Sequence, residues 1–271
     1  MLSRKSIAVI GGGKMGETLV AGLLDAGLIS RERIRVTDSH PDRIKLLRDR
    51  FKVRTETDNA AAVRESEVVI LAVKPQVMRE VLDGIKDAVT PKHLVISIAA
   101  SVTTSFIERI LGDKAAVVRV MPNTPCLIRQ GMAGLSPGRN AGASEMDVVK
   151  QIFGSLGRCL VLDEKHMDAL TALSASGPAF LYVIIEALAE GGVKVGLPRD
   201  MATELAAQTM LGTAQMVLQT GEHPAKLKDA VTTPAGCTID GLLELEEGGL
   251  RVTLIKAIVK ATQRARELVN D

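Results

Sequence analysis

The sequence is poor in aromatic residues: its 271 residues include four Phe, one Tyr and no Trp. Nucleic-acid-binding proteins commonly stack bases on aromatic side chains and gather basic residues on one face. Here the formal net charge is only +2 and the basic residues are scattered along the chain. The composition therefore argues against a nucleic-acid partner.

Cysteine and histidine are also scarce. The cysteines are odd in number and lie far apart, at Cys126, Cys159 and Cys237. This pattern argues against a disulfide framework and for a reducing compartment, so we expect a cytoplasmic protein. The four histidines form no pair at metal-ligand spacing: His40, His93, His166 and His223. We predict no structural metal.

No uninterrupted apolar segment reaches the ~18 residues that a membrane span requires. The first strand-like run, Ile7–Ile10, begins too early in the sequence to follow a signal peptide. We therefore expect neither a membrane span nor a leader. The composition, 46% hydrophobic and 24% charged, is that of a packed globular protein.

The first part of the chain alternates short β-branched runs with amphipathic stretches. The strand candidates are Ile7–Ile10, Ile34–Thr37, Val68–Ala72, Leu94–Ile98 and Ala116–Met121. The helix candidates are Glu17–Ala26, Asp42–Arg50, Gln76–Asp87 and Thr103–Leu111. Apolar strands alternating with helices indicate an α/β fold, a Rossmann-type doubly wound parallel sheet with helices on both faces. A helix near Ser144–Leu156 and a strand at Cys159–Leu162 would close a domain over residues 1–162.

Residues 163–271 have no strand runs, and Pro and Gly punctuate helical segments. Between Glu204 and Glu222 there is no charged residue for 17 positions. A helix without a charged face must be buried all round. A helical domain of this size has little interior for it, so we expect an all-helical dimerisation domain. A central helix in a monomeric bundle is the alternative.

A glycine-rich sequence, G-x-G-x-x-G, directly follows the first strand and precedes the first helix. In such a loop, Gly11 permits the tight turn, Gly13 lets a pyrophosphate approach the backbone, and Gly16 lets the helix pack close to the strand. The pyrophosphate would lie on the N–H groups of the helix, near Lys14 and Met15. The pattern predicts dinucleotide binding.

The same fingerprint expects an acidic residue ~20 positions further on, and Asp38 follows the second strand there. A carboxylate at this place would bond the ribose hydroxyls of NAD and repel the phosphate of NADP. Ser39, His40 and Arg43 follow, and they would form a phosphate cradle if Asp38 turned away. Asp38 as the N-cap of the next helix is a further alternative. The choice between NAD(H) and NADP(H) stays open.

Several motifs resemble those of the pyrroline-5-carboxylate reductases, and the resemblance runs over essentially the whole chain. In the first half they are Ala72–Pro75, Ser97–Thr103 and Met121–Pro125. In the second half they are Leu173–Ala179, Gly191–Arg199, His223–Asp229 and Thr232–Thr238. The resemblance implies reduction of the cyclic imine 1-pyrroline-5-carboxylate to L-proline with NADPH or NADH, the last step of proline biosynthesis. It also implies a helical domain that interlocks with its twin, and suggests a decamer of five dimers.

Carried over by position, Asn59 resembles the side chain that helps to hold the adenosine end of the cofactor. The residues that resemble the lining of the nicotinamide path are Ala72, Val73, Lys74, Pro75, Ala99, Ala100, Met121 and Asn123. This agrees with the rule that ligands bind outside the carboxyl ends of parallel strands. Lys74 as a solvated lysine and Asn123 as a turn former are the plain alternatives.

Reduction of the imine needs an anchor for the carboxylate and a donor beside the ring nitrogen. The turn that ends at Thr238 precedes a helical run, Ile239–Glu247, so N–H groups at Gly236 and Cys237 would be free for an anion. Thr238 is the candidate for the hydroxyl that contacts the imine nitrogen, with Thr233 in support; its alternative role is an ordinary N-cap. Thr171 is a weaker candidate for the pocket wall.

The sequence departs from the usual family pattern at four positions. Ala175 and Ala235 stand where glycine is common, Phe180 stands where tyrosine is frequent, and Cys237 lies in the substrate loop. The two alanines narrow the backbone conformations available.

Two other functions compete with the reductase. A β-hydroxyacid dehydrogenase or other imine reductase would use a lysine of the helical domain, for which Lys194 is the candidate. A non-catalytic dinucleotide sensor would need only the glycine loop. A substrate panel that compares the cyclic imine with hydroxy acids separates the enzymes, and absence of cofactor oxidation with the imine would favour the sensor.

Overall fold

The computed structural model of the chain describes residues 2–112 and 115–267, which form two compact units. The first unit runs up to Ala175 and takes in the chain again from Thr262; the second is Ser176–Ala261. The sequence predicts a functional boundary after residue 162. That boundary stays a prediction, because the two units are defined by their compactness and not by what they bind.

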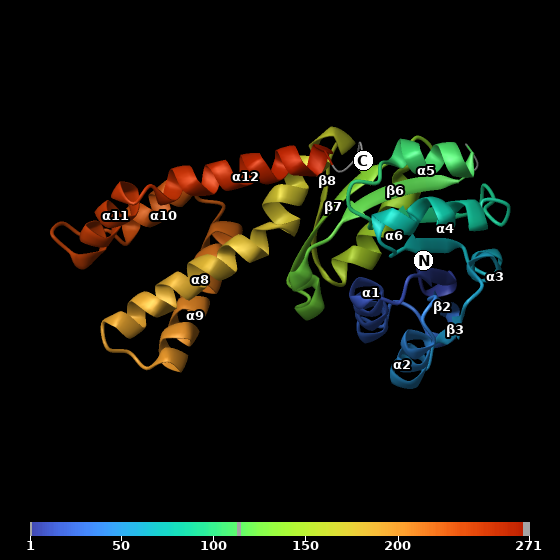
Figure 1. Cartoon of the computed structure of the whole chain (residues 1–271), viewed down its shortest axis with the longest axis horizontal. Helices are drawn as coiled ribbons and strands as arrows, with labels where there is room; N and C mark the ends of the chain where they lie inside the picture. The colour runs from blue at the N-terminus through green and yellow to red at the C-terminus, as the bar shows by residue number, and fades with distance from the viewer. Residues whose placement is uncertain (1, 113–114, 268–271) are drawn as a thin grey trace. The chain divides into compact units, whose positions relative to one another are not determined.

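An eight-stranded sheet forms the centre of the first unit (Figure 1), with the strand order β3-β2-β1-β4-β5-β6-β7-β8. The strands are β1 (Ile7–Ile10), β2 (Ile34–Thr37), β3 (Arg54–Glu56), β4 (Val68–Leu71), β5 (Leu94–Ser97), β6 (Ala116–Met121), β7 (Gly131–Pro137) and β8 (Gly157–Val161). Strands β1 to β6 are parallel, in the order typical of a dinucleotide-binding Rossmann sheet. The prediction of this fold class is confirmed. The sheet is not wholly parallel, however, because β7 pairs antiparallel with β6.

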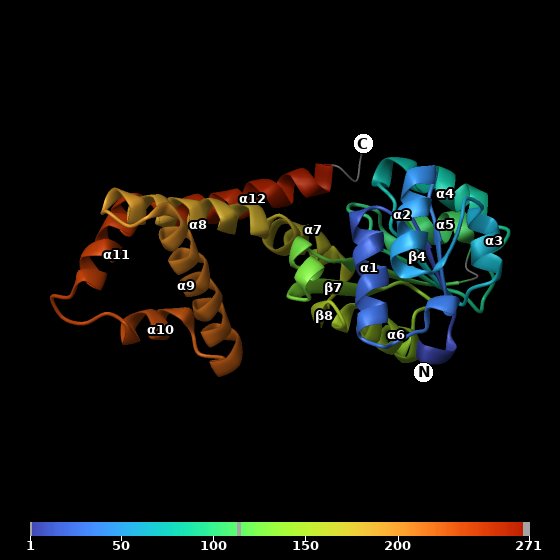
Figure 2. The same ribbon diagram turned by 90° about the horizontal axis from the view of Figure 1, so that it is seen from below.

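Helices cover both faces of the sheet (Figures 1 and 2). They are α1 (Lys14–Asp25), α2 (Pro41–Phe51), α3 (Asn59–Arg64), α4 (Met78–Ile85), α5 (Thr104–Leu111) and α6 (Ala143–Gly154). Alternate strand residues enter two separate cores: Val118 and Val120 of β6 pack on the side that holds Phe153 of α6, and Val117 packs on the side of α4 and α5.

Short turns of helix connect these elements. They are η1 (Leu2–Arg4), η2 (Arg31–Arg33), η3 (Pro75–Val77), η4 (Thr124–Ile128) and η5 (Glu164–His166). After η5, a short α7 (Met167–Leu170) continues into a π-helical segment, η6 (Thr171–Ala175). π-Helical turns often lie at functional sites.

The second unit is helical, and no strand follows Val161 in the residues that the structure describes. Its helices are α8 (Gly177–Lys194), α9 (Arg199–Thr220), α10 (Pro224–Ala230), α11 (Cys237–Glu247) and the first part of α12 (Leu250–Glu267). Helices α8 and α9 pack against each other (Figure 2) around a small core of Ala189, Ala202 and Ala206.

The uncharged helix expected between Glu204 and Glu222 is α9, and a single chain does not bury it. Its large apolar side chains remain about half exposed: Leu205 52%, Leu211 47%, Met216 52% and Leu218 57%. The helical run Glu164–Lys194 is likewise long and apolar enough to cross a membrane, and only 17% of its most apolar stretch is buried. In a single chain, both helical segments therefore leave large apolar side chains exposed to solvent.

Candidate active site

The glycine loop lies at the carboxyl end of β1, where the sheet order changes direction between β1 and β4. Gly11 has a φ of +103°, a conformation that favours glycine, and a Cβ there would lie 2.6 Å from the carbonyl oxygen of Ala72. A Cβ on Gly16 would lie 2.1 Å from the carbonyl oxygen of Gly11, so only glycine lets α1 pack this close to β1.

Gly13 differs from these two glycines because a Cβ at this position would meet no atom within 4 Å. Gly13 is the N-cap of α1, whose first N–H groups have no acceptor within the helix. Free N–H groups, the positive end of the helix dipole and open space beside the backbone suit a pyrophosphate. The loop therefore fits the phosphates of a dinucleotide.

Asp38 follows β2 and lies against the glycine loop. Its Oδ2 accepts a hydrogen bond from the Gly12 N–H at 2.8 Å, and its Oδ1 accepts one from the His40 N–H at 2.8 Å. The N-cap of α2 is His40, so the alternative role of Asp38 as that N-cap is wrong. Arg43 donates to the Gly12 carbonyl oxygen and to Glu17, so its guanidinium is already bonded to the loop and to α1.

A cleft of about 250 Å³ opens beside Asp38. Four of the residues expected to bind the cofactor line it: Gly11, Asp38, Asn59 and Val73. The Asn59 Oδ1 accepts a hydrogen bond from the Thr37 hydroxyl at 2.5 Å, which fixes the amide at the wall of the cleft. The sequence did not point to Thr37 or Glu80, which also line the cleft. Thr37 ends β2, a position that could have indicated it, whereas Glu80 lies in the first turn of α4.

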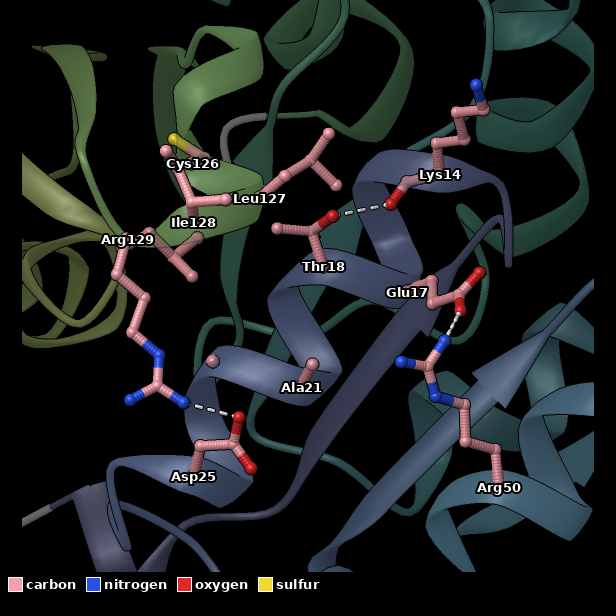
Figure 3. Close-up of a pocket in the computed structure, with 12 residues that line it drawn as sticks. Lys14, Glu17, Thr18, Ala21, Asp25, Arg50, Cys126, Leu127, Ile128 and Arg129 are labelled. Atoms are coloured by element: carbon pink, nitrogen blue, oxygen red, sulfur yellow. Dashed lines mark hydrogen bonds and ion pairs between the residues drawn. The ribbon is translucent and has the colours of Figure 1, made fainter. Parts of the chain in front are cut away.

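Lys14 lines a different hollow, of about 420 Å³, between α1 and η4 (Figure 3). The acidic residues of this hollow are paired, Glu17 with Arg50 and Asp25 with Arg129. The hydroxyl of Thr18 donates to the Lys14 carbonyl oxygen at 2.7 Å. The Lys14 side chain points away from the other residues of this hollow (Figure 3).

The remaining strand-end candidates follow β4, β5 and β6. Lys74 and Pro75 are exposed, Ala72, Val73 and Ala100 are half-buried, and Ala99 and Met121 are buried. The Asn123 amide bonds within the protein: its Nδ2 donates to the Ser174 carbonyl oxygen at 3.2 Å, and its Oδ1 accepts from the Met132 N–H at 2.9 Å. These bonds join Asn123 to two distant parts of the first unit and give it a fixed place in the fold, while its side chain makes no capping bond in its own turn.

The second unit holds the threonine-bearing turn. Helix α11 begins at Cys237 with Gly236 as its N-cap, so Thr238 lies inside the first turn, and its alternative role as an N-cap is wrong. The Thr233 hydroxyl lies close to Gly236, where an added Cβ would approach it to 2.3 Å. Cys237 is exposed, while Gly236 and Thr238 are half-buried. The turn thus presents the free N–H groups of a helix start and a hydroxyl beside them.

The two alanines that replace common glycines differ in backbone conformation. Ala235 has a φ of +54°, in the left-handed region that alanine adopts only at a cost. Ala175 ends the π-helical segment η6, a right-handed conformation that suits alanine. Only the replacement at 235 therefore strains the backbone. Thr171 begins the same segment, and its hydroxyl donates to the Met167 carbonyl oxygen at 2.7 Å.

Two of the three cysteines are unsuited to chemistry at neutral pH. Burial raises the pKa of the Cys126 thiol and also that of Cys159, so both stay protonated. Cys237 differs from them because it is exposed at the start of α11.

The Rossmann sheet, the glycine loop at its switch point and a separate helical unit define the class of this protein, a nicotinamide-dinucleotide-dependent oxidoreductase. Residues 6–101 match the family described as NADP oxidoreductase coenzyme F420-dependent, and residues 164–268 match the family described as pyrroline-5-carboxylate reductase dimerisation. The chain is 44% identical to the pyrroline-5-carboxylate reductase of Methanosarcina acetivorans over 98% of its length and 99% of the relative. It therefore belongs to the pyrroline-5-carboxylate reductase family.

Solved structures agree. A pyrroline-5-carboxylate reductase from Coxiella burnetii superposes with a TM-score of 0.91 at 37% identity, over 97% of this chain and 98% of the other. The Plasmodium falciparum pyrroline carboxylate reductase, solved with NADP bound, superposes with a TM-score of 0.89 at 30% identity, over 99% and 100%. The resemblance seen in the sequence is confirmed.

The protein is an NAD(P)H-dependent oxidoreductase of proline biosynthesis that reduces 1-pyrroline-5-carboxylate to L-proline. It forms homo-oligomers, because its second half is a dimerisation domain of this family. The apolar run Glu164–Lys194 lies in the region that matches this domain, so a second copy accounts for its exposed surface better than a membrane does.

Proposed function

We propose that the first unit binds the cofactor through the Gly11–Gly16 loop, Asp38 and Asn59, and that the turn ending at Thr238 binds the imine. The observation that supports this proposal best is the open space at Gly13. Packing against neighbouring backbone explains the glycines at 11 and 16, whereas at Gly13 only a bound ligand would need the space. Lys14, Met15 and the strand-end residues Ala72–Pro75, Ala99, Ala100, Met121 and Asn123 complete the proposed cofactor site.

When bound, the reduced nicotinamide supplies the hydride that adds to the imine carbon. The electron pair of the C=N bond then moves to the ring nitrogen, which needs a proton. In the proposal, the Thr238 hydroxyl hydrogen-bonds to that nitrogen and orients the ring, while the proton comes from water through the protonated imine. No strongly basic side chain is required.

The substrate carboxylate needs an anion site. In the proposal, the N–H groups of Gly236 and Cys237, at the positive end of the α11 dipole, bind this carboxylate. Thr233 supports the turn from beside Gly236. Thr171, at the start of the π-helical segment, forms part of the pocket wall.

We also propose that the homo-oligomer is built on a dimer through the C-terminal helices, assembled as a decamer of five dimers in the cytoplasm. The half-exposed apolar face of α9 supports the dimer. Light scattering after size-exclusion chromatography tests it. A single species of ten chains is expected, and a monomer at micromolar concentration contradicts the dimer.

The test of the site is cofactor oxidation with the cyclic imine, run in parallel with NADH and NADPH. Turnover with the imine but not with β-hydroxy acids is expected. The same assay on a Thr238→Ala variant then separates the roles, because wild-type turnover that survives unchanged in the variant removes Thr238 from the mechanism.

A further inference from the structure

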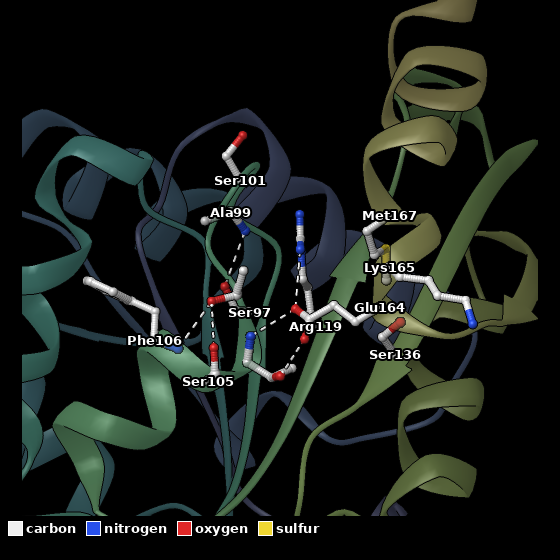
Figure 4. A network of polar contacts seen from close by, with 12 residues as sticks. Ser97, Ala99, Ser101, Ser105, Phe106, Arg119, Ser136, Glu164, Lys165 and Met167 are labelled. Carbon is white, nitrogen blue, oxygen red and sulfur yellow. Dashed lines mark hydrogen bonds and ion pairs between the residues drawn. The ribbon is translucent and has the colours of Figure 1, made fainter. Parts of the chain in front are cut away.

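A buried arginine lies in the middle of β6. Arg119 is 2% exposed, between Val118 and Val120, whose side chains enter the opposite core. Its Nη1 donates to the Glu164 Oε1 at 3.2 Å (Figure 4). Within residues 2–112 and 115–267, Glu164 is its only ion-pair partner, and the Arg119 Nε and Nη2 atoms have no hydrogen-bond partner. Among the described residues, Glu164 alone therefore compensates the buried positive charge of Arg119.

Glu164 also holds the start of α5. Its Oε1 accepts a hydrogen bond from the Thr104 N–H at 2.9 Å, and its Oε2 accepts one from the Thr104 hydroxyl at 2.5 Å. Thr104 is 6% exposed, and the Glu164 side chain is 26% exposed. Both carboxylate oxygens thus hold donors, and the donors come from two elements of the first unit.

The three segments joined by Glu164 all lead to proposed site residues. The loop that carries Ala99 and Ala100 leads into the start of α5 at Thr104. In this loop, Ser101 has a strained φ of +63°. Strand β6 runs on to Met121 and Asn123. The chain after Glu164 runs through α7 into the π-helical segment, where the Ser174 carbonyl oxygen accepts from Asn123.

The segment 164–175 is therefore fastened to the sheet at both ends. Glu164 fastens one end, through Arg119 and Thr104, and Ser174 fastens the other, through Asn123. The bonds of Glu164 involve none of the proposed site residues, whereas the bond of Ser174 is made to Asn123 of the proposed cofactor site. Their common effect is to fix the backbone that presents Thr171 and the strand ends.

We propose that Glu164 is a positioning residue for hydride transfer, which acts through Thr104 and Arg119. The inference rests on the proposed site above. Hydride transfer depends on distance so steeply that a misplacement of about 1 Å costs up to about 100-fold in rate. The Glu164 carboxylate fixes the position of the strand ends at the proposed nicotinamide site relative to Thr171. Its loss should therefore lower kcat more than it weakens the binding of cofactor or substrate.

The obvious variant, Glu164→Gln, removes the partner of a buried charge, and that alone destabilises a fold strongly. The decisive variant is Thr104→Val, which removes the bond to Glu164 Oε2 and keeps the ion pair with Arg119. Thr104→Ser is the matched control, because it keeps the hydroxyl and loses only a methyl group.

With the imine and saturating cofactor, we expect Thr104→Val to lower kcat about tenfold while both KM values stay within about twofold. The primary deuterium isotope effect on kcat, measured with 4-deuterated cofactor, rises as hydride transfer becomes rate-limiting. Thr104→Ser keeps kcat within about twofold of the wild type. Circular dichroism shows that each variant is folded.

A folded Thr104→Val variant with wild-type kcat and isotope effect overturns the inference and leaves the proposed function standing. Equal losses in the valine and serine variants also overturn it, because packing would then be the cause. A wild-type protein that does not oxidise cofactor with the imine overturns the proposed function, and this inference with it.

Discussion

The carboxylate of Asp38 and the backbone N–H of Gly12 are joined by a hydrogen bond of 2.8 Å. This bond connects the end of β2 to the glycine loop and holds a negative charge beside the cleft that Asn59 lines. In the proposed cofactor site, this charge faces the adenosine ribose, where the two nicotinamide cofactors differ.

Asp38→Asn tests the role of this charge. Asparagine keeps an acceptor for the Gly12 N–H and removes the repulsion of a 2′-phosphate. We expect the ratio of kcat/KM for NADPH to that for NADH to rise about tenfold, which corresponds to ~1.4 kcal/mol. Steady-state kinetics with both cofactors measure it, and an unchanged ratio would mean that Asp38 does not face the ribose.

Two glycines of the loop form a matched pair. Gly13→Ala adds a methyl group to open space, so we expect the KM for cofactor to rise at least about tenfold while folding loses about 1 kcal/mol or less. Gly16→Ala places its methyl group against the Gly11 carbonyl oxygen and should lower the melting temperature much further. Thermal unfolding without cofactor compares them. Unaltered cofactor binding by Gly13→Ala would contradict the proposed phosphate site.

Thr238→Ala should reduce kcat by roughly 10- to 10³-fold, at or below the lower range for one acid–base participant. Thr238→Ser, which retains the hydroxyl, is the control and should keep most of the activity. Steady-state rates on the folded variants decide it. Comparable losses in both variants would point to packing rather than to the hydroxyl.

Restoring glycine at 235 and at 175 should have opposite effects on stability. Ala235→Gly relieves a left-handed alanine and is expected to stabilise the protein by about 0.5–1 kcal/mol, after the entropy of the unfolded chain is counted. Ala175→Gly places glycine in a helical segment and should destabilise it by about 1 kcal/mol. Denaturant unfolding measures both, and a loss of stability in Ala235→Gly would refute the strain.

The sequence predicted the strands whose burial is continuous. Ile7–Ile10 and Ala116–Met121 coincide with β1 and β6, because runs of β-branched and apolar residues have few alternatives to a doubly covered sheet. It missed β3, which has three residues at the sheet edge, and β7, whose Gly, Ala and Ser residues have low strand propensity. Tertiary pairing forms both.

The site shows the same division. The glycine loop was predictable because its function resides in local spacing. The bonds of Asn123 to Ser174 and of Arg119 to Glu164 join residues 51 and 45 positions apart, and nothing in the local sequence predicts either pairing. Arg119, in particular, is an arginine, a residue that usually lies on the solvated surface, yet here it is buried in the core.

If a second copy covers the apolar side chains of α9, as proposed, the stability of each subunit depends on protein concentration. In the proposed dimer, association buries the half-exposed leucines of α9, so the melting temperature of the second unit should rise with protein concentration. Newly synthesised subunits are therefore most exposed to aggregation and proteolysis before they have met a twin.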